Sequence, residues 1–183
     1  MRLGELLLKQ QPQYGDGLVK AYRSRALLRF SLKKINDALQ DYDRAVEITT
    51  GPLRREIRWD RFRLLGPVMP HDHAVAEAHD LEASGEPDAA GLYALAVVHA
   101  ASAVSVASDK RLTEAQRNHL AREYADDALR CLVRTRKAGY FDEPVKLTEF
   151  QNDPGFRYLS FFHAGFQQFR TELLASLGPA QKK

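Results

Sequence analysis

The sequence contains one cysteine, Cys131, and almost no excess of charge of either sign. A single cysteine excludes an intramolecular disulfide framework and a zinc site built from several thiolates, and it suits a reducing compartment. The 27 basic and 24 acidic residues leave a net charge of +3, an excess too small to indicate nucleic-acid binding by itself. The 183 residues, 44% of them hydrophobic, are enough to bury a core without a metal or a disulfide.

Targeting and membrane signals are also weak. Near the N-terminus, Glu5 and Lys9 bracket only three leucines, so the apolar core of a signal peptide is missing. Residues 89–108 carry no charged side chain and are long enough to cross a membrane, but they are rich in alanine, which contributes little insertion energy. We therefore expect this segment to be a helix buried among other helices, in a cytoplasmic protein without a membrane partner.

Strand patterns are nearly absent, whereas apolar residues repeat at helical spacing along most of the chain. Capping signals support several helix starts: Thr113 with Gln116 three residues later, and Asp72, Asp88 and Asp153 as N-cap residues. The sequence therefore predicts an all-α fold of antiparallel helix pairs. The expected helices cover residues 19–30, 35–48, 53–65, 73–83, 88–107, 113–137 and 164–177.

One stretch of about 34 residues, beginning at Val19, follows a repeat pattern in which large aromatic and small residues alternate. Such alternation lets neighbouring helices pack closely, so the pattern concerns packing rather than catalysis. The aromatic positions are Tyr22 and Tyr42, and the small positions are Ala26, Ala38 and Ala45. On these residues the segment resembles the tetratricopeptide repeat (TPR) family, although Arg25 replaces the usual leucine and Thr50 the usual proline.

A weaker match to the same pattern occurs later in the chain, at Leu92, Ala96, Ala128 and Leu132, with His99 in place of an aromatic residue. The resemblance implies a short TPR-like superhelix with a C-terminal capping helix. The expected segments are 1–18, the end of a preceding helix and a linker; 19–52, a clear TPR unit; 53–87, a degenerate helix pair; 88–140, a long degenerate TPR-like pair; 141–177, capping helices; and 178–183, a frayed tail.

The second half also resembles a narrower group, the C-terminal TPR tail of some bacterial serine/threonine protein kinases. The phrases that carry this likeness include Leu92-Tyr-Ala-Leu-Ala96, Ala138-Gly-Tyr140 and Asn152-Asp-Pro-Gly-Phe156. The glycine-rich loop, the His-Arg-Asp loop and the Asp-Phe-Gly motif of a kinase domain are missing from the sequence. The resemblance therefore implies an association with kinase signalling, and leaves a protein kinase open as the partner, without implying kinase activity.

Two sets of residues are candidates for partner binding. In the unit that begins at Val19, the resemblance implies that the concave face meets a peptide or helix of a partner. The second set shares one face of the helix over 53–65, and its guanidinium groups suit an acidic or phosphorylated peptide or, alternatively, nucleic acid. For this second face, a solvated surface paired locally with Glu56 and Asp60 is the favoured interpretation. The first set is Lys20, Arg23, Leu27 and Phe30, and the second set is Arg54, Arg58 and Arg61.

Three histidines, His71, His73 and His79, lie close together in the sequence beside two aspartates. A metal site is not favoured, because His73 and His79 are about 240° apart around a helix and so point to different faces. The sequence thus favours a non-enzymatic TPR-type scaffold with no cofactor and no metal. Two alternatives stay open: a detached regulatory tail of a bacterial kinase, and a small metal-dependent enzyme that uses the three histidines. An uncapped first repeat would also predict self-association.

Overall fold

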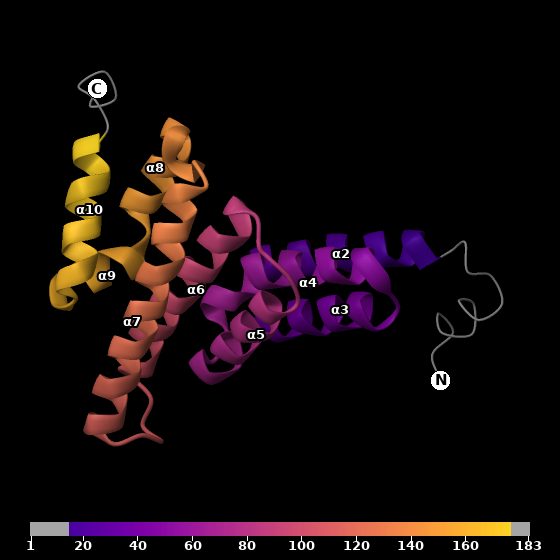
Figure 1. Ribbon diagram of the computed structural model, residues 1–183. Coiled ribbons are helices and arrows are strands. Elements are labelled where there is room, and N and C mark those ends of the chain that lie inside the picture. Colours follow the sequence, from indigo (N-terminus) through magenta and orange to yellow (C-terminus); the bar gives the residue numbers. More distant parts are fainter. Residues whose placement is uncertain (1–14, 177–183) are drawn as a thin grey trace. The chain divides into compact units, whose positions relative to one another are not determined.

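The computed structural model describes residues 15–176, in which it contains nine α-helices, two short 3-10 helices and no strand. The prediction of an all-α fold is therefore confirmed. The chain divides into two compact units, one ending at Leu65 and the other beginning at Gly66 (Figure 1). The expected tail over 178–183 lies outside the described residues, as does most of the segment expected over 1–18.

The first unit contains α2 (Gly15–Ser31), α3 (Ile35–Glu47) and α4 (Gly51–Leu65). A three-residue turn joins α2 to α3, and the two helices pack along each other, so they form an antiparallel pair (Figure 1). Helix α4 then packs against α3. Gly51 begins α4 with a φ of 57°, a conformation that glycine adopts at no steric cost.

Small side chains set how closely the helices of this unit approach. Ala26, Ala38 and Ala45 are fully buried between α2, α3 and their neighbours, and Tyr42 is buried beside them. Tyr22 is half-buried. Alanine at a helix crossing leaves room for the facing backbone, while the aromatic residue fills the space around it. The residues expected to pack at the second match, Leu92, Ala96, Ala128 and Leu132, are likewise buried.

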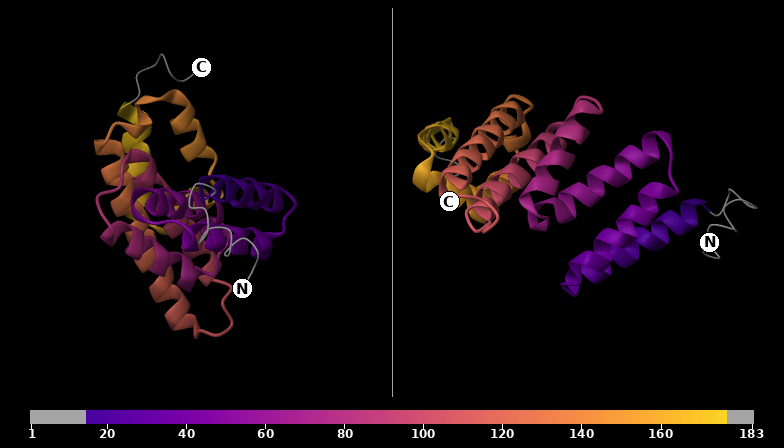
Figure 2. Two further views of the ribbon diagram at one scale, coloured as in Figure 1. Left: turned by 90° about the vertical axis from the view of Figure 1, so that its right-hand side faces the viewer. Right: turned by 90° about the horizontal axis from the view of Figure 1, so that it is seen from below.

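The second unit is built around α6. This helix packs along α7 and also contacts α5, α9 and η2, and α10 packs against α7 and α9 (Figure 1 and Figure 2). The single cysteine, Cys131, is fully buried in α7, and burial raises the pKa of its thiol to about 12. The elements are η2 (Gly66–Val68), α5 (His71–Ala83), α6 (Ala89–Val106), α7 (Glu114–Lys137), η3 (Tyr140–Asp142), α8 (Pro144–Asn152), α9 (Pro154–Phe162) and α10 (Ala164–Ser176).

Most of the predicted caps are present. Asp88 accepts a hydrogen bond from the Gly91 N–H at 2.7 Å, and Thr113 forms a reciprocal capping box with Gln116. Asp153 accepts from the Phe156 N–H at 3.1 Å. The prediction that Asp72 caps the fourth helix is wrong: α5 begins at His71, because the Pro70 carbonyl accepts the first helical hydrogen bond, from the Ala74 N–H.

Helix α6 meets the length and composition test for a membrane span, as the sequence already indicated. Within the second unit, however, 61% of this span is buried against other helices. A core helix of a folded domain passes the same test, so the apolar composition of α6 is weak evidence for a membrane.

The segment expected as a degenerate helix pair, 53–87, is distributed over both units. Its first helix, α4, packs against α3 in the first unit, and its second helix, α5, packs against α6 in the second. The Gly66-Pro67 break separates them. Each of the two helices thus covers the apolar face of a different neighbour.

The aromatic residues near the C-terminus have two different environments. Phe150, Phe156 and Phe166 form a buried cluster with ring centroids 5.1 to 6.0 Å apart. They join α8, α9 and α10 into one core. Phe161 instead is 84% exposed.

Close packing of α9 on α6 depends on Gly155. A Cβ at this position would lie 3.0 Å from the Cβ of Ala100 on α6. We expect Gly155→Ala to lower the free energy of unfolding by about 1–2 kcal/mol, because the new methyl group must displace α9. Urea unfolding followed by circular dichroism measures the change. Gly17→Ala is the matched control, since nothing lies within 4 Å of its added Cβ; equal stability of the two variants would contradict the close packing.

Candidate functional site

A pocket of about 350 Å³ opens on the first unit. All three helices of that unit contribute to it, and its apolar surface comes mainly from leucines, of which Leu27 is 52% exposed. The lining residues are Arg23 and Leu27 from α2, Tyr42 from α3, and Asp60, Arg63 and Leu64 from α4.

The charged side chains of this pocket are paired with one another. Arg23 forms an ion pair with Asp60 and lies 3.3 Å from a carboxylate oxygen of Glu56. Arg63 lies 3.6 Å from the other oxygen of Asp60, and its guanidinium lies over the ring of Trp59. The guanidinium groups of Arg23 and Arg63 both pair with Asp60 and lie next to an apolar wall. A ligand carboxylate would share these two groups with Asp60.

The four residues expected on the concave face of α2 are only partly gathered at this pocket. Arg23 and Leu27 line it, whereas Lys20 and Phe30 are not among the lining residues. Lys20 is exposed and Phe30 is half-buried. Tyr42, which the sequence pattern assigns to packing, also reaches the pocket wall.

The arginine face of α4 is a separate surface. Arg61 points toward α3, where its Nη1 lies 3.0 Å from a carboxylate oxygen of Asp43. Arg54 is exposed and Arg58 is half-buried. At about 100° per residue, these three arginines and the pocket residues of α4 lie on different faces of the helix. The centres of the two faces are roughly 130° apart around the helix axis. The two sets of candidate partner-binding residues therefore do not form one site.

A buried carboxylate, Asp41, links α2 to α3. Arg25 donates to it through Nε at 2.9 Å and through Nη2 at 2.6 Å, and Arg29 lies 2.8 Å away through Nη1. This pairing raises the pKa of Arg25. Arg25 is the residue that replaces the usual leucine of the repeat, so the structure gives a physical reason for this departure: the arginine neutralises a charge that the helix pair buries.

The three histidines considered as a metal site do not converge. His71 is buried, with Nε2 3.0 Å from Asp109 and Nδ1 3.1 Å from the hydroxyl of Tyr124. Asp109 also accepts hydrogen bonds from Arg111, which hold the pKa of that carboxyl well below its usual range. His73 is exposed. His71 therefore joins α5 to the segment between α6 and α7 and to α7 itself.

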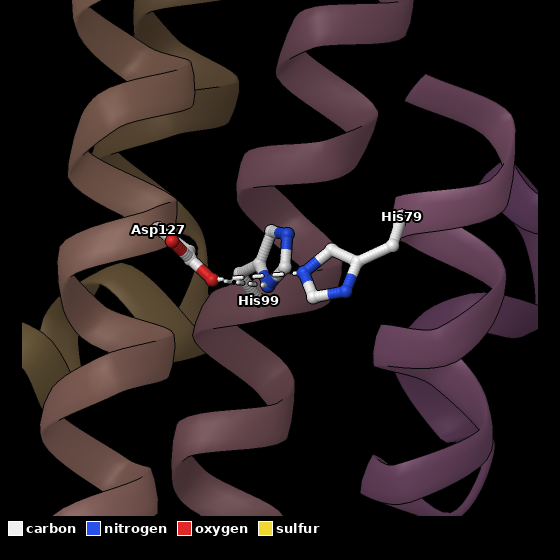
Figure 3. Close-up of side chains that lie close together, drawn as sticks. All are labelled: His79, His99 and Asp127. Atoms are coloured by element: carbon white, nitrogen blue, oxygen red, sulfur yellow. Dashed lines mark ion pairs between the residues drawn. The ribbon is translucent and has the colours of Figure 1, made fainter. Parts of the chain in front are cut away.

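His79 instead meets two residues that are distant in the sequence. His99 of α6 and Asp127 of α7 lie beside it, and the three side chains point toward one another (Figure 3). The Oδ2 atom of Asp127 is 3.9 Å from Nε2 of His79 and 4.0 Å from Nδ1 of His99. Burial lowers the pKa of His99 to about 4, so the ring is neutral at pH 7.

Sequence patterns did not identify this cluster. Each of its residues comes from a different helix, and no spacing rule connects them. The one available signal was His99 itself, the only histidine of an apolar helix that contains no Asp, Glu, Lys or Arg.

Comparisons with protein-family models, with curated proteins and with solved structures gave no match. The function is therefore argued from the geometry of the pocket and of the histidine cluster.

The bridge at Asp41 yields a test of the first unit. We expect Asp41→Asn to lower the free energy of unfolding by about 1–3 kcal/mol, because it removes the charge from hydrogen bonds made to a buried carboxylate. The measurement is urea unfolding at neutral pH.

Asp43→Asn is the matched control for this test. Asp43 lies on the same helix, but its side chain is half exposed in its pair with Arg61, so we expect a change below about 1 kcal/mol. If Asp43→Asn lowers the free energy of unfolding as much as Asp41→Asn does, burial of the Asp41 charge is not the cause of the loss.

Proposed function

We propose that the chain is a non-enzymatic, TPR-type scaffold whose pocket on the first unit receives a peptide or a helix of a partner protein. The observation that carries this proposal is the pocket itself, which lies between α2 and α4 and has the exposed Leu27 at its wall. In a TPR-like array, these two helices would be the first helices of successive repeats, which line the concave surface.

The packing of the first unit supports the TPR-like part of the proposal. Helices α2 and α3 form a short-turn antiparallel pair, and α4 follows at the position where the next repeat would begin. The small residues of the repeat pattern are fully buried at the helix contacts. A superhelix of stacked pairs requires each pair to bury a face against the next element, and α3 does so against α4.

The chemistry of the pocket indicates what it would bind. Leu27 and Leu64 offer an apolar wall, and Arg23 and Arg63 share the carboxylate of Asp60. A ligand with a large apolar side chain next to an acidic residue would cover the leucines and join this charge network. Because guanidinium groups bind carboxylates in two-pronged geometry, an acidic residue adds orientation as well as attraction.

The test uses short peptides as defined probes. Random peptides displayed on phage are selected against the immobilised full chain, and the affinity of the enriched peptides is measured by fluorescence anisotropy. We expect Leu27→Glu to weaken the selected peptides at least about tenfold, because it places a charge in the apolar wall of the pocket. We also expect the enriched sequences to combine an apolar anchor with an acidic residue.

Leu28→Glu is the matched control. Leu28 is the next residue of α2, is 59% exposed, and does not line the pocket. Equal losses in both leucine variants, or affinity lost only in an Arg54/Arg58/Arg61→Ala variant, would place the binding surface elsewhere. If the selected motif occurs in a protein kinase, the kinase becomes the partner to test.

A further inference from the structure

The second unit contains a buried histidine whose ring is not hydrogen-bonded. The side chain of His99 is fully buried, and among residues 15–176 neither ring nitrogen has a hydrogen-bond partner. In folded proteins nearly every buried polar group is hydrogen-bonded, so an unpartnered imidazole in a core requires a physical explanation. A hydrophobic side chain of similar size would fill the same space without the loss of hydration.

The surroundings of His99 supply that explanation. His79 and Asp127 approach it from the two neighbouring helices, and one potential ligand atom from each of the three residues lies within 4.8 Å of the others. The two measured separations from Oδ2 of Asp127, 3.9 and 4.0 Å, are too long for hydrogen bonds. A zinc ion with bonds of about 2.0–2.1 Å would hold such atoms about 3.3 Å apart. The two sides of the triangle that meet at Oδ2 would therefore contract by about 0.7 Å, and the side between the two imidazole nitrogens, which is at most 4.8 Å, by up to about 1.5 Å.

The carboxylate is already oriented for this role. Arg130 donates a hydrogen bond to Oδ1 of Asp127 at 2.6 Å, which leaves Oδ2 facing the two imidazole rings (Figure 3). Metal-binding carboxylates and imidazoles are commonly held by such an outer hydrogen bond.

The donor set identifies the class of ion. Two imidazole nitrogens and one carboxylate oxygen suit zinc and similar first-row divalent ions, whereas magnesium and calcium prefer oxygen ligands throughout. Three protein ligands leave a fourth tetrahedral position for water. The side chain of His79 is 57% exposed, so an ion can enter from solvent on that side.

We propose that His79, His99 and Asp127 bind one zinc-class divalent ion, through Nε2, Nδ1 and Oδ2 respectively. The ion would join α5, α6 and α7, of which α5 and α7 are also connected by the ion pair between Glu82 and Arg134. This site is independent of the peptide pocket, since all three ligands belong to the second unit.

The experiment measures zinc binding to the full chain, purified without a histidine tag and freed of metal with a chelator. Isothermal titration calorimetry with zinc chloride compares the natural chain with His79→Ala and Asp127→Asn. His79 is the main target, because its exposure allows substitution without opening the core. We expect one zinc ion per chain, and at least about tenfold weaker binding in both variants, since even the loss of an outer hydrogen bond to a ligand weakens metal sites 10- to 100-fold.

His73→Ala is the matched control, because His73 is an exposed histidine on the same helix and lies outside the cluster. We expect it to bind zinc as the natural chain does. The proposal is overturned if the natural chain binds no zinc, if His73→Ala and His79→Ala weaken binding equally, or if magnesium binds as tightly as zinc.

Thermal unfolding gives a second, independent measurement. An ion that binds only the folded chain raises its melting temperature. Saturating zinc should therefore raise the melting temperature of the natural chain and of His73→Ala by similar amounts, and that of His79→Ala by clearly less. An equal rise in all three would assign the effect to zinc bound elsewhere and would overturn the site.

Discussion

The burial of α6 is the constraint on which the second unit depends. This helix has no charged residue along its length and is covered by α5, α7 and α9. Its many alanines have short side chains, so the backbones of neighbouring helices can approach α6 closely. Gly155 of α9 makes such a close approach at Ala100. The aromatic cluster of the C-terminal helices packs around the same centre.

Two of the buried polar side chains, Asp41 and His99, have different surroundings. Asp41 is held by two arginines that reach in from the exposed side of α2. His99 lies among apolar residues, without a hydrogen bond to any described residue, but opposite another histidine and a carboxylate. In a medium of low polarity a buried ionised group requires a partner of opposite charge, which Asp41 has. A neutral imidazole beside two further donors has the chemistry of a ligand rather than of a structural bridge.

The two units offer different chemistry. The first unit has a pocket with an apolar wall and internally paired charges, which suits reversible binding of a peptide. The second has a compact set of nitrogen and oxygen donors at the junction of three helices, which suits an ion. The pocket and the histidine cluster lie in different compact units. We therefore expect a single substitution in one of them to leave the structure of the other unit intact.

The sequence by itself determined the helical class, most helix positions and most caps, because periodicity, capping residues and glycine-proline breaks act over a few neighbouring residues. It also indicated that the repeat alanines would lie where neighbouring helices pack closely. It placed the start of α5 two residues late and treated Arg25 as a departure from a pattern, because the partner of Arg25 lies on another helix.

Only the tertiary structure decided which side chains meet. It placed Arg61 beside Asp43 and apart from the pocket, and it separated His71 from His79. It also brought His79 together with two residues 20 and 48 positions away. Contacts of this kind depend on how whole helices pack, which the spacing of residues within one helix does not specify.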